Sequence, residues 1–115
     1  TLVELMIVVA VIGILSAVAL PNFLQARNAA AAGAAVGEAL GLAKECATLA
    51  ISDIGDAPSG GNLSINCNAT SGTVTGSFTA GASGIRCLDK TSSASNKGVS
   101  VSISSLGAIT CAFTT

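Results

Sequence analysis

An uncharged apolar run near the start of the chain limits what this protein can fold into. Residues 5–26, which lie between Glu4 and Arg27, carry no formal charge, and from Leu5 to Leu20 only Ser16 is polar. As a helix rising ~1.5 Å per residue, this run is about as long as the ~30 Å hydrocarbon core of a bilayer is thick. The run therefore predicts a helix that spends part of its existence in a membrane.

A cleaved secretory signal peptide is the simplest other source of such a run, but three features disfavour it. No basic residue precedes the run, the run is longer than the usual apolar core of a signal peptide, and helical patterning continues to about residue 54. We therefore expect the segment to belong to the mature protein.

Residues 1–54 are predicted to form one long helix, in which Pro21 is the only strong breaker. Proline lacks the N–H that would bond the carbonyl of Ala17, so a kink or a local loss of helix is expected there. Gly13 weakens the preceding turns. The stretch from Gly13 to Pro21 is the expected soft part of the helix.

Beyond the proline, the helical pattern is amphipathic. One apolar stripe is suited to cover a sheet, and polar residues lie opposite it. The stripe comprises Val36, Leu40, Ala43, Ala47, Ala50 and Ile54, with Glu38, Glu45 and Ser52 on the other side. Leu42 and Leu49 form a second, offset strip, which we expect to be free for another partner.

Gly33, Gly37 and Gly41 recur every four residues and so lie along one side of the helix. Such a row allows close approach of another backbone. Small residues also accompany any alanine-rich segment, and the sequence does not decide between the two interpretations.

From about residue 55 the chain becomes polar, since 20 of its last 61 residues are Ser or Thr, and the apolar residues recur every two positions. Residues 55–61 are predicted to form a loop. The alternation predicts half-buried strands at residues 63–67, 74–78, 85–87, 99–103 and 109–113. The short connection at residues 104–107 suits a hairpin, which makes the sheet antiparallel.

The predicted fold class is α+β, with a long N-terminal helix whose C-terminal half packs on a small antiparallel sheet. Residues 1–27 form the hydrophobic helix, and residues 28–115 form a globular head. Within the head we expect an amphipathic helix at 28–54, a loop at 55–61 and the sheet at 62–115.

The cysteines Cys46, Cys67, Cys87 and Cys111 form no C-x-x-C pair, and the chain has no histidine, so no zinc site is predicted. An even number in a small Ser/Thr-rich domain indicates two disulfides in an oxidising compartment rather than four free thiols. Three connectivities are possible. Because Cys67, Cys87 and Cys111 share the parity of inward strand residues and Cys46 borders the apolar stripe, we predict Cys46–Cys67 and Cys87–Cys111.

The residues give no support for an enzyme, a metal site or a cofactor. The chain has no histidine, tyrosine or tryptophan, no nucleophile beside a base and no phosphate-binding glycine loop. Asp53 and Asp56 are interpreted as solvated loop acids rather than as a carboxylate pair or a calcium site. The triplets beginning at Asn62 and Asn68 have the form of N-glycosylation sites, a match that is common in sequence of this composition.

Direct nucleic-acid binding is not expected. Only Arg86, Lys90 and Lys97 are basic in the sheet region, and the net charge of the chain is −1. Binding to a phosphate backbone depends on several such cations together.

The opening segment TLVELMIVVAVIGILSAVALP resembles the mature N-terminus of a type IV pilin. The resemblance rests on T-L-V-E-L-M-I-V-V, on the following glycine and on A-L-P at matching spacing. It covers residues 1–27 closely and the remaining layout loosely. Pilins of this family begin one residue earlier, with an N-methylated residue that is usually phenylalanine.

The resemblance implies roles for several residues. Glu4 matches the glutamate that neutralises the N-terminal amine of a neighbouring subunit, and Thr1, Leu2 and Val3 match the segment recognised by the prepilin peptidase and its methylating activity. Gly13 and Pro21 match the residues between which the helix loses regular structure in assembled pili.

The cysteines agree with the family only in part. Cys87 and Cys111 match the pair that closes the C-terminal loop in this family. Cys46 and Cys67 depart from the commonest pattern, so the resemblance gives them no role.

Physical chemistry independently singles out Glu4. An ionised carboxylate within hydrocarbon costs several kcal/mol unless it is paired. No Lys or Arg precedes Arg27, which leaves an amine terminus as the available cation. The alternative is that Glu4 lies in the headgroup region beside water.

The resemblance implies a structural subunit that polymerises with itself into a filament serving adhesion, motility or DNA uptake. Its partners would be the inner membrane before assembly, the prepilin peptidase and the assembly machinery, and the filament would lie at the cell surface. Two alternatives are a pseudopilin of type II secretion and a monomeric, membrane-anchored binding module.

Overall fold

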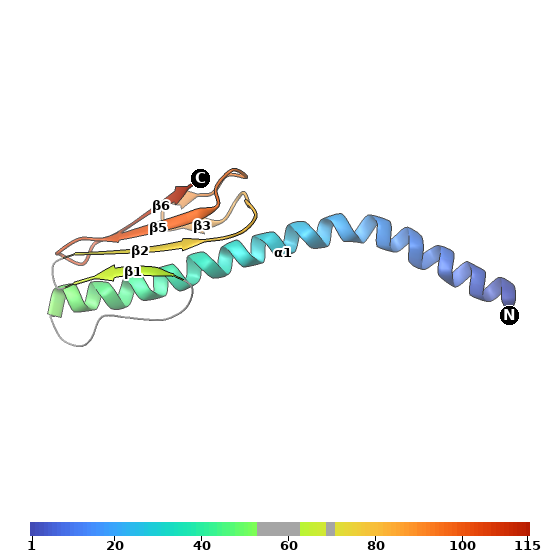
Figure 1. Ribbon diagram of the computed structural model, residues 1–115, viewed down its shortest axis with the longest axis horizontal. Helices are drawn as coiled ribbons and strands as arrows, with labels where there is room; N and C mark the ends of the chain where they lie inside the picture. The colour runs from blue at the N-terminus through green and yellow to red at the C-terminus, as the bar shows by residue number, and fades with distance from the viewer. Residues whose placement is uncertain (53–62, 69–70) are drawn as a thin grey trace.

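The computed structural model describes residues 1–52, 63–68 and 71–115. Helix α1 spans Leu2–Ser52 and carries a small β-sheet head on its C-terminal half. The N-terminal half of α1 projects beyond the head with no other element beside it (Figure 1). The molecule is consequently elongated, and its longest dimension is 72 Å.

Helix α1 continues without a break across Gly13 and Pro21. Of the two outcomes expected at the proline, a kink or a local loss of helix, the single chain does not show the loss of helix. A proline removes one hydrogen bond and crowds one carbonyl, while the bonds of the flanking turns remain. The helix is bowed rather than interrupted (Figure 1).

Four antiparallel strands form the main sheet, in the order β1-β2-β5-β6. Their bounds are Ser64–Cys67 for β1, Gly72–Ser77 for β2, Gly98–Ile103 for β5 and Ile109–Thr114 for β6. The β5–β6 connection is the predicted hairpin, and the register places Val101 beside both Val74 and Cys111. The predicted α+β class, a long helix packed on a small antiparallel sheet, is confirmed.

Two very short strands differ from the expectation of one sheet. Strands β3 (Arg86–Cys87) and β4 (Lys90–Thr91) pair only with each other, in a separate two-stranded sheet. No alternation could predict β4, because two residues are too few to show a period of two.

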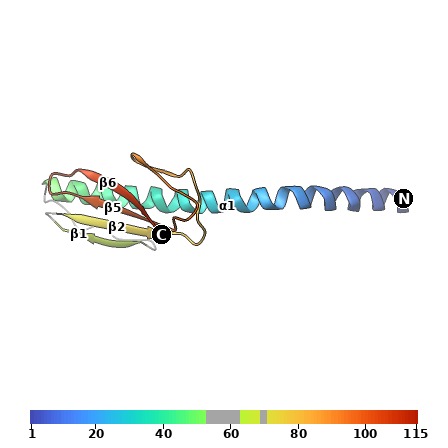
Figure 2. The ribbon, with the colours of Figure 1, turned by 90° about the horizontal axis from the view of Figure 1, so that it is seen from above.

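The head core lies between α1 and the sheet, which covers one side of the helix when viewed from above (Figure 2). The largest fully buried side chains include Val74, Val99 and Val101, and Ile103 completes this row. A second cluster, formed by Ala32, Phe78 and Ala82, closes the end of the head nearer the N-terminus. The alternation of the strands therefore assigned their inner faces correctly.

The helix face that meets the sheet is rotated from the predicted stripe. Ala39 and Cys46 are fully buried, whereas Leu40 and Ala50 are only half-buried. Glu38, Glu45 and Ser52 are exposed, as expected. Ile54 lies outside the described residues.

The expectation that Leu42 and Leu49 remain free is wrong. Leu42 is half-buried and packs against the core cluster, and Leu49 is buried. The head covers a wider arc of the helix than a flat sheet on one stripe would. The predicted loop at residues 55–61, together with Asp53, Asp56 and Asn62, lies outside the described residues.

Candidate assembly surface

The surface most in need of a partner is the projecting half of α1. All 15 large apolar side chains from Leu2 to Leu24 are exposed, with exposed fractions between 48% and 74%. The helix is apolar on every side here, because only Ser16 interrupts the run from Leu5 to Leu20. A helix that is apolar all round is stable only inside a membrane or inside a larger protein core.

The same segment satisfies the requirements for a membrane span. Among the described residues, α1 is the one helix long and apolar enough to cross a bilayer. None of its most apolar window is buried within the chain. The segment is thus compatible with membrane anchoring before any other partner covers it.

Glu4 lies in the first turn of α1, where the helix dipole favours a negative charge. Its side chain is exposed, and within residues 1–52, 63–68 and 71–115 it forms no ion pair. Thr1 precedes the helix, and its carbonyl accepts a hydrogen bond from the N–H of Leu5 at 3.0 Å. Thr1, Leu2, Val3 and Glu4 therefore form one short exposed end.

Gly13 and Pro21 lie further along the same exposed segment, away from the head. A Cβ atom added at Gly13 would meet nothing within 4 Å. The same holds for Gly33, Gly37 and Gly41, so the head does not use the glycine row to approach α1 closely. The row is open to a partner from outside the chain.

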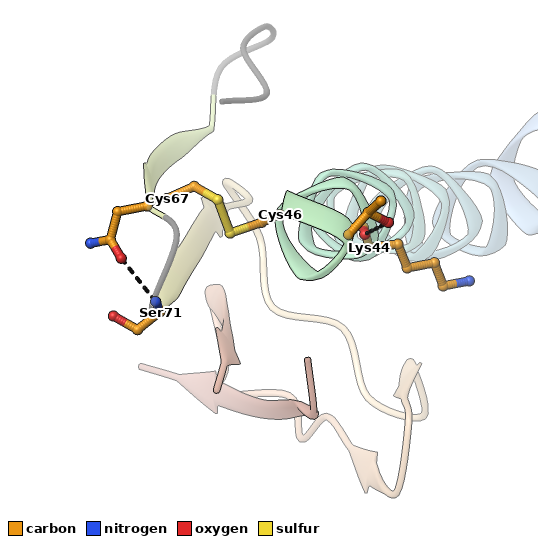
Figure 3. Close-up of a disulfide and its surroundings, with 6 residues drawn as sticks. Lys44, Cys46, Cys67 and Ser71 are labelled. Carbon is orange, nitrogen blue, oxygen red and sulfur yellow. Dashed lines mark hydrogen bonds between the residues drawn. A yellow bond between two sulfur atoms is a disulfide. The ribbon is translucent and has the colours of Figure 1, made fainter. Parts of the chain in front are cut away.

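The disulfides are Cys46–Cys67 and Cys87–Cys111, the pairing given by the strand parity. Cys46–Cys67 joins α1 to the edge strand β1 across a Cα separation of 5.8 Å (Figure 3). Just beyond it, the side chain of Asn68 accepts a hydrogen bond from the N–H of Ser71 at 2.8 Å. Cys87–Cys111 joins the small β3–β4 sheet to β6 across 6.0 Å. The first bond fixes the sheet to the helix, and the second joins two parts of the head to each other.

Three surface features were missed by sequence reasoning. Leu106 is 86% exposed, Leu88 is 44% exposed with a φ of 55°, and two hollows lie where residues 79–83 face residues 22–31 of α1. Only the turn at Leu106 could have been anticipated from the local sequence, because Gly107 follows it directly and glycine tolerates the positive φ of a tight turn. The hollows depend on segments about 55 residues apart, which no local pattern reveals.

Comparisons were made with protein-family models, with curated proteins and with solved structures. No family model, no curated protein and no solved structure matches this chain. The functional argument therefore depends on the geometry of the chain and on its N-terminal residues.

Proposed function

We propose that this protein is a structural subunit that polymerises with itself into a type IV pilus, a surface filament. The observation that carries the proposal is the exposure of all the large apolar residues from Leu2 to Leu24 on a helix that projects from a folded head. Contiguous apolar surface of this extent requires cover. A bundle of the same helices from many copies supplies that cover and leaves the heads outside.

The segment suits two environments in succession. Its length and composition fit a bilayer, and its uniform apolar surface fits equally well among identical helices. We propose that the subunit rests in the inner membrane, where the prepilin peptidase acts on the Thr1 to Val3 segment, and then moves into the filament. The assembly machinery would transfer it from lipid to the protein core.

Glu4 supplies the selectivity of this transfer. Its carboxylate has no ion-pair partner among the described residues, and an unpaired charge is costly in an apolar surrounding. In a bundle, the N-terminal amine of a neighbouring subunit would lie close to the carboxylate of Glu4. Pairing of the two charges would favour docking of a new subunit over its return to lipid.

The head is suited to form the outer coat. Its outward strand residues are mostly Ser and Thr, and two disulfides hold its small core together. The whole chain has only three phenylalanines, and one of them, Phe23, lies exposed outside the head. Adhesion, motility and DNA uptake are the roles such a filament serves. Exposed hydroxyl-rich surface agrees with contact with water rather than with catalysis.

A monomeric membrane-anchored module is the second candidate, because the membrane-length helix serves simple anchoring equally well. A type II secretion pseudopilin would share the N-terminal segment but form only a short periplasmic piston. Electron microscopy of material sheared from the producing cells, with peptide mass mapping, separates the pilus from the other two candidates. Long thin fibres containing this chain support the pilus, and retention of all the protein in membranes contradicts it.

A further inference from the structure

The head has two hollows at its N-terminal end, where the projecting half of α1 leaves it. The larger hollow, of about 540 Å³, is lined by small residues and by three amide-bearing residues of the helix, Asn22, Gln25 and Asn28. The smaller, of about 400 Å³, is lined in part by Arg27 and Thr79. Asn28 lines both hollows, so they are adjacent.

The lining carries hydrogen-bond donors that have no partner inside the described part of the chain. The guanidinium of Arg27 and the hydroxyl of Thr79 form no hydrogen bond or ion pair there. The backbone N–H groups of residues 79–83 likewise bond none of the described residues. Such donors need water or a ligand as their partner, and successive free N–H groups in a loop are one means by which proteins bind anions.

The charge of the lining also favours an anion. None of the residues that line the two hollows is acidic, and Arg27 is the one cation among them. The nearest carboxylate on α1 belongs to Glu38, about 16 Å further along the axis at ~1.5 Å per residue. A phosphate would therefore pair with Arg27, whereas an ammonium group would find no counter-charge in the lining.

The loop that forms one wall of the hollows is firmly held. Gly81 lies against the carbonyl oxygen of Ala94 so closely that a Cβ at residue 81 would overlap it. Ser92 is only 5% exposed; its hydroxyl donates to the carbonyl of Ala82 and accepts from the N–H of Ile85 at 3.0 Å. The hollows are therefore fixed features of the head.

The hollows lie just beyond the end of the membrane-length segment. Leu24, the last large apolar residue of the projecting half, lines the smaller hollow, and Arg27 follows three residues later. From Leu2 to Leu24, α1 rises about 33 Å at ~1.5 Å per residue, close to the ~30 Å hydrocarbon core of a bilayer. When this segment spans a bilayer, Arg27 and the hollows lie at the depth of the lipid headgroups, where an arginine at a helix end is favoured.

We infer that, while the subunit rests in the membrane, the two hollows bind the headgroup of an anionic phospholipid that carries hydroxyl groups. The smaller hollow holds the lipid phosphate through Arg27, Thr79 and the N–H groups of residues 79–83. The larger hollow holds the hydroxyl groups, since amide side chains both donate and accept hydrogen bonds. The inference rests on the membrane stage of the proposed function and gives that stage a ligand.

The bound headgroup fixes the depth at which the subunit lies. From Glu4 to Arg27, α1 rises about 35 Å at ~1.5 Å per residue. With Arg27 held at the phosphates of one leaflet, Glu4 lies near the opposite edge of the ~30 Å hydrocarbon core.

Spin-labelled lipids test the site in the full chain. The protein is reconstituted in phosphatidylcholine bilayers, and electron paramagnetic resonance measures the association of spin-labelled phosphatidylglycerol relative to spin-labelled phosphatidylcholine. We expect phosphatidylglycerol to be preferred at least about fivefold, and Arg27→Gln to abolish the preference. Lys44→Gln makes the same change of charge at another exposed position of α1 and should retain the preference.

Two further variants distinguish a built site from a single charge at headgroup depth. Thr79→Val removes a hydroxyl from the smaller hollow, and Asn28→Ala removes the amide that both hollows share. Each variant keeps Arg27 and should lower the preference at least about twofold, as expected for the loss of one hydrogen bond. An unchanged preference in both variants would overturn the site.

The remaining controls identify the source of the phosphate and separate the site from the proposed function. Inorganic phosphate, compared with chloride at equal ionic strength, should leave the lipid preference unchanged; removal of the preference by phosphate would overturn the lipid as the ligand. Insertion is measured by flotation of the vesicles. A chain that inserts but shows no preference overturns the site alone, whereas a chain that fails to insert contradicts the membrane stage of the proposed function as well.

Discussion

Gly72 of β2 lies so close to the Sγ atom of Cys46 that a Cβ at position 72 would overlap the sulfur. Gly72 is also the cross-strand partner of Cys67, the other half of this disulfide. The sulfur of Cys46 thus occupies the space in which a side chain at residue 72 would lie. The disulfide and the glycine form one structural unit that attaches β1 and β2 to α1.

Replacement of Gly72 by valine should therefore destabilise the head or prevent the Cys46–Cys67 bond. We expect a loss of roughly 2–5 kcal/mol in the free energy of unfolding, the range for losing a native disulfide in a small domain. Thermal unfolding of the full chain in detergent and titration of free thiols measure the two effects. An unchanged melting temperature with no free thiol would contradict this role of Gly72.

Gly37 provides a contrasting case, because a Cβ at this position meets nothing. Gly37→Ala should raise the free energy of unfolding by up to about 1 kcal/mol, since alanine is the better helix former. If another copy approaches the glycine row, the yield of fibres should nevertheless fall with Gly37→Ala and fall further with Gly37→Leu. Equal yields from all three proteins would show that the row merely reflects an alanine-rich composition.

Pro21 should still leave a soft point in α1, although the helix continues through it. Without its N–H, the carbonyl of Ala17 lacks its usual partner, and neighbouring turns open more easily. In the full chain in detergent, Pro21→Ala should slow hydrogen exchange of the amides at residues 22–25 by about tenfold to hundredfold. Exchange that is already as slow as at residues 8–12 in the unmodified chain would contradict a soft point.

Glu4→Gln keeps the shape of the side chain and removes its charge. We expect the variant to insert in the membrane and to form both disulfides, but to yield at least about tenfold fewer fibres, as expected for loss of a charge pair in an apolar surrounding. Glu38→Gln, on the exposed face of the head helix, is the matched control and should assemble normally. A normal yield from Glu4→Gln would exclude charge pairing as the basis of docking.

The strand period and the cysteine parity were sufficient to predict the main architecture. Val74, Val99, Val101 and Ile103 are buried as the alternation requires, because each strand of an antiparallel sheet presents only one face to its covering helix. The same parity placed Cys67 and Cys111 on the inner face, within reach of Cys46 and Cys87. The alternation of apolar and polar residues was clear because one face of each strand is buried and the other faces water.

The remaining features depend on packing that a local pattern does not determine. Leu88 has a positive φ, which glycine or asparagine adopts more readily than leucine. A leucine at this position therefore gave no indication of the turn. Leu49 lies outside the apolar stripe predicted from the helical periodicity, but it is buried because the head covers a wider part of the α1 surface than that stripe. The hollows beside Arg27 exist only once residues 79–83 lie against α1.

The central claim is that the apolar residues from Leu2 to Leu24 form the shared core of a filament. A helical reconstruction of the sheared fibres by cryo-electron microscopy tests it most directly. We predict a bundle of these segments at the fibre axis, with the Ser/Thr-rich sheets on the outside. Fibres in which residues 2–24 lie on the outer surface, or fibres that lack this chain, would contradict the claim.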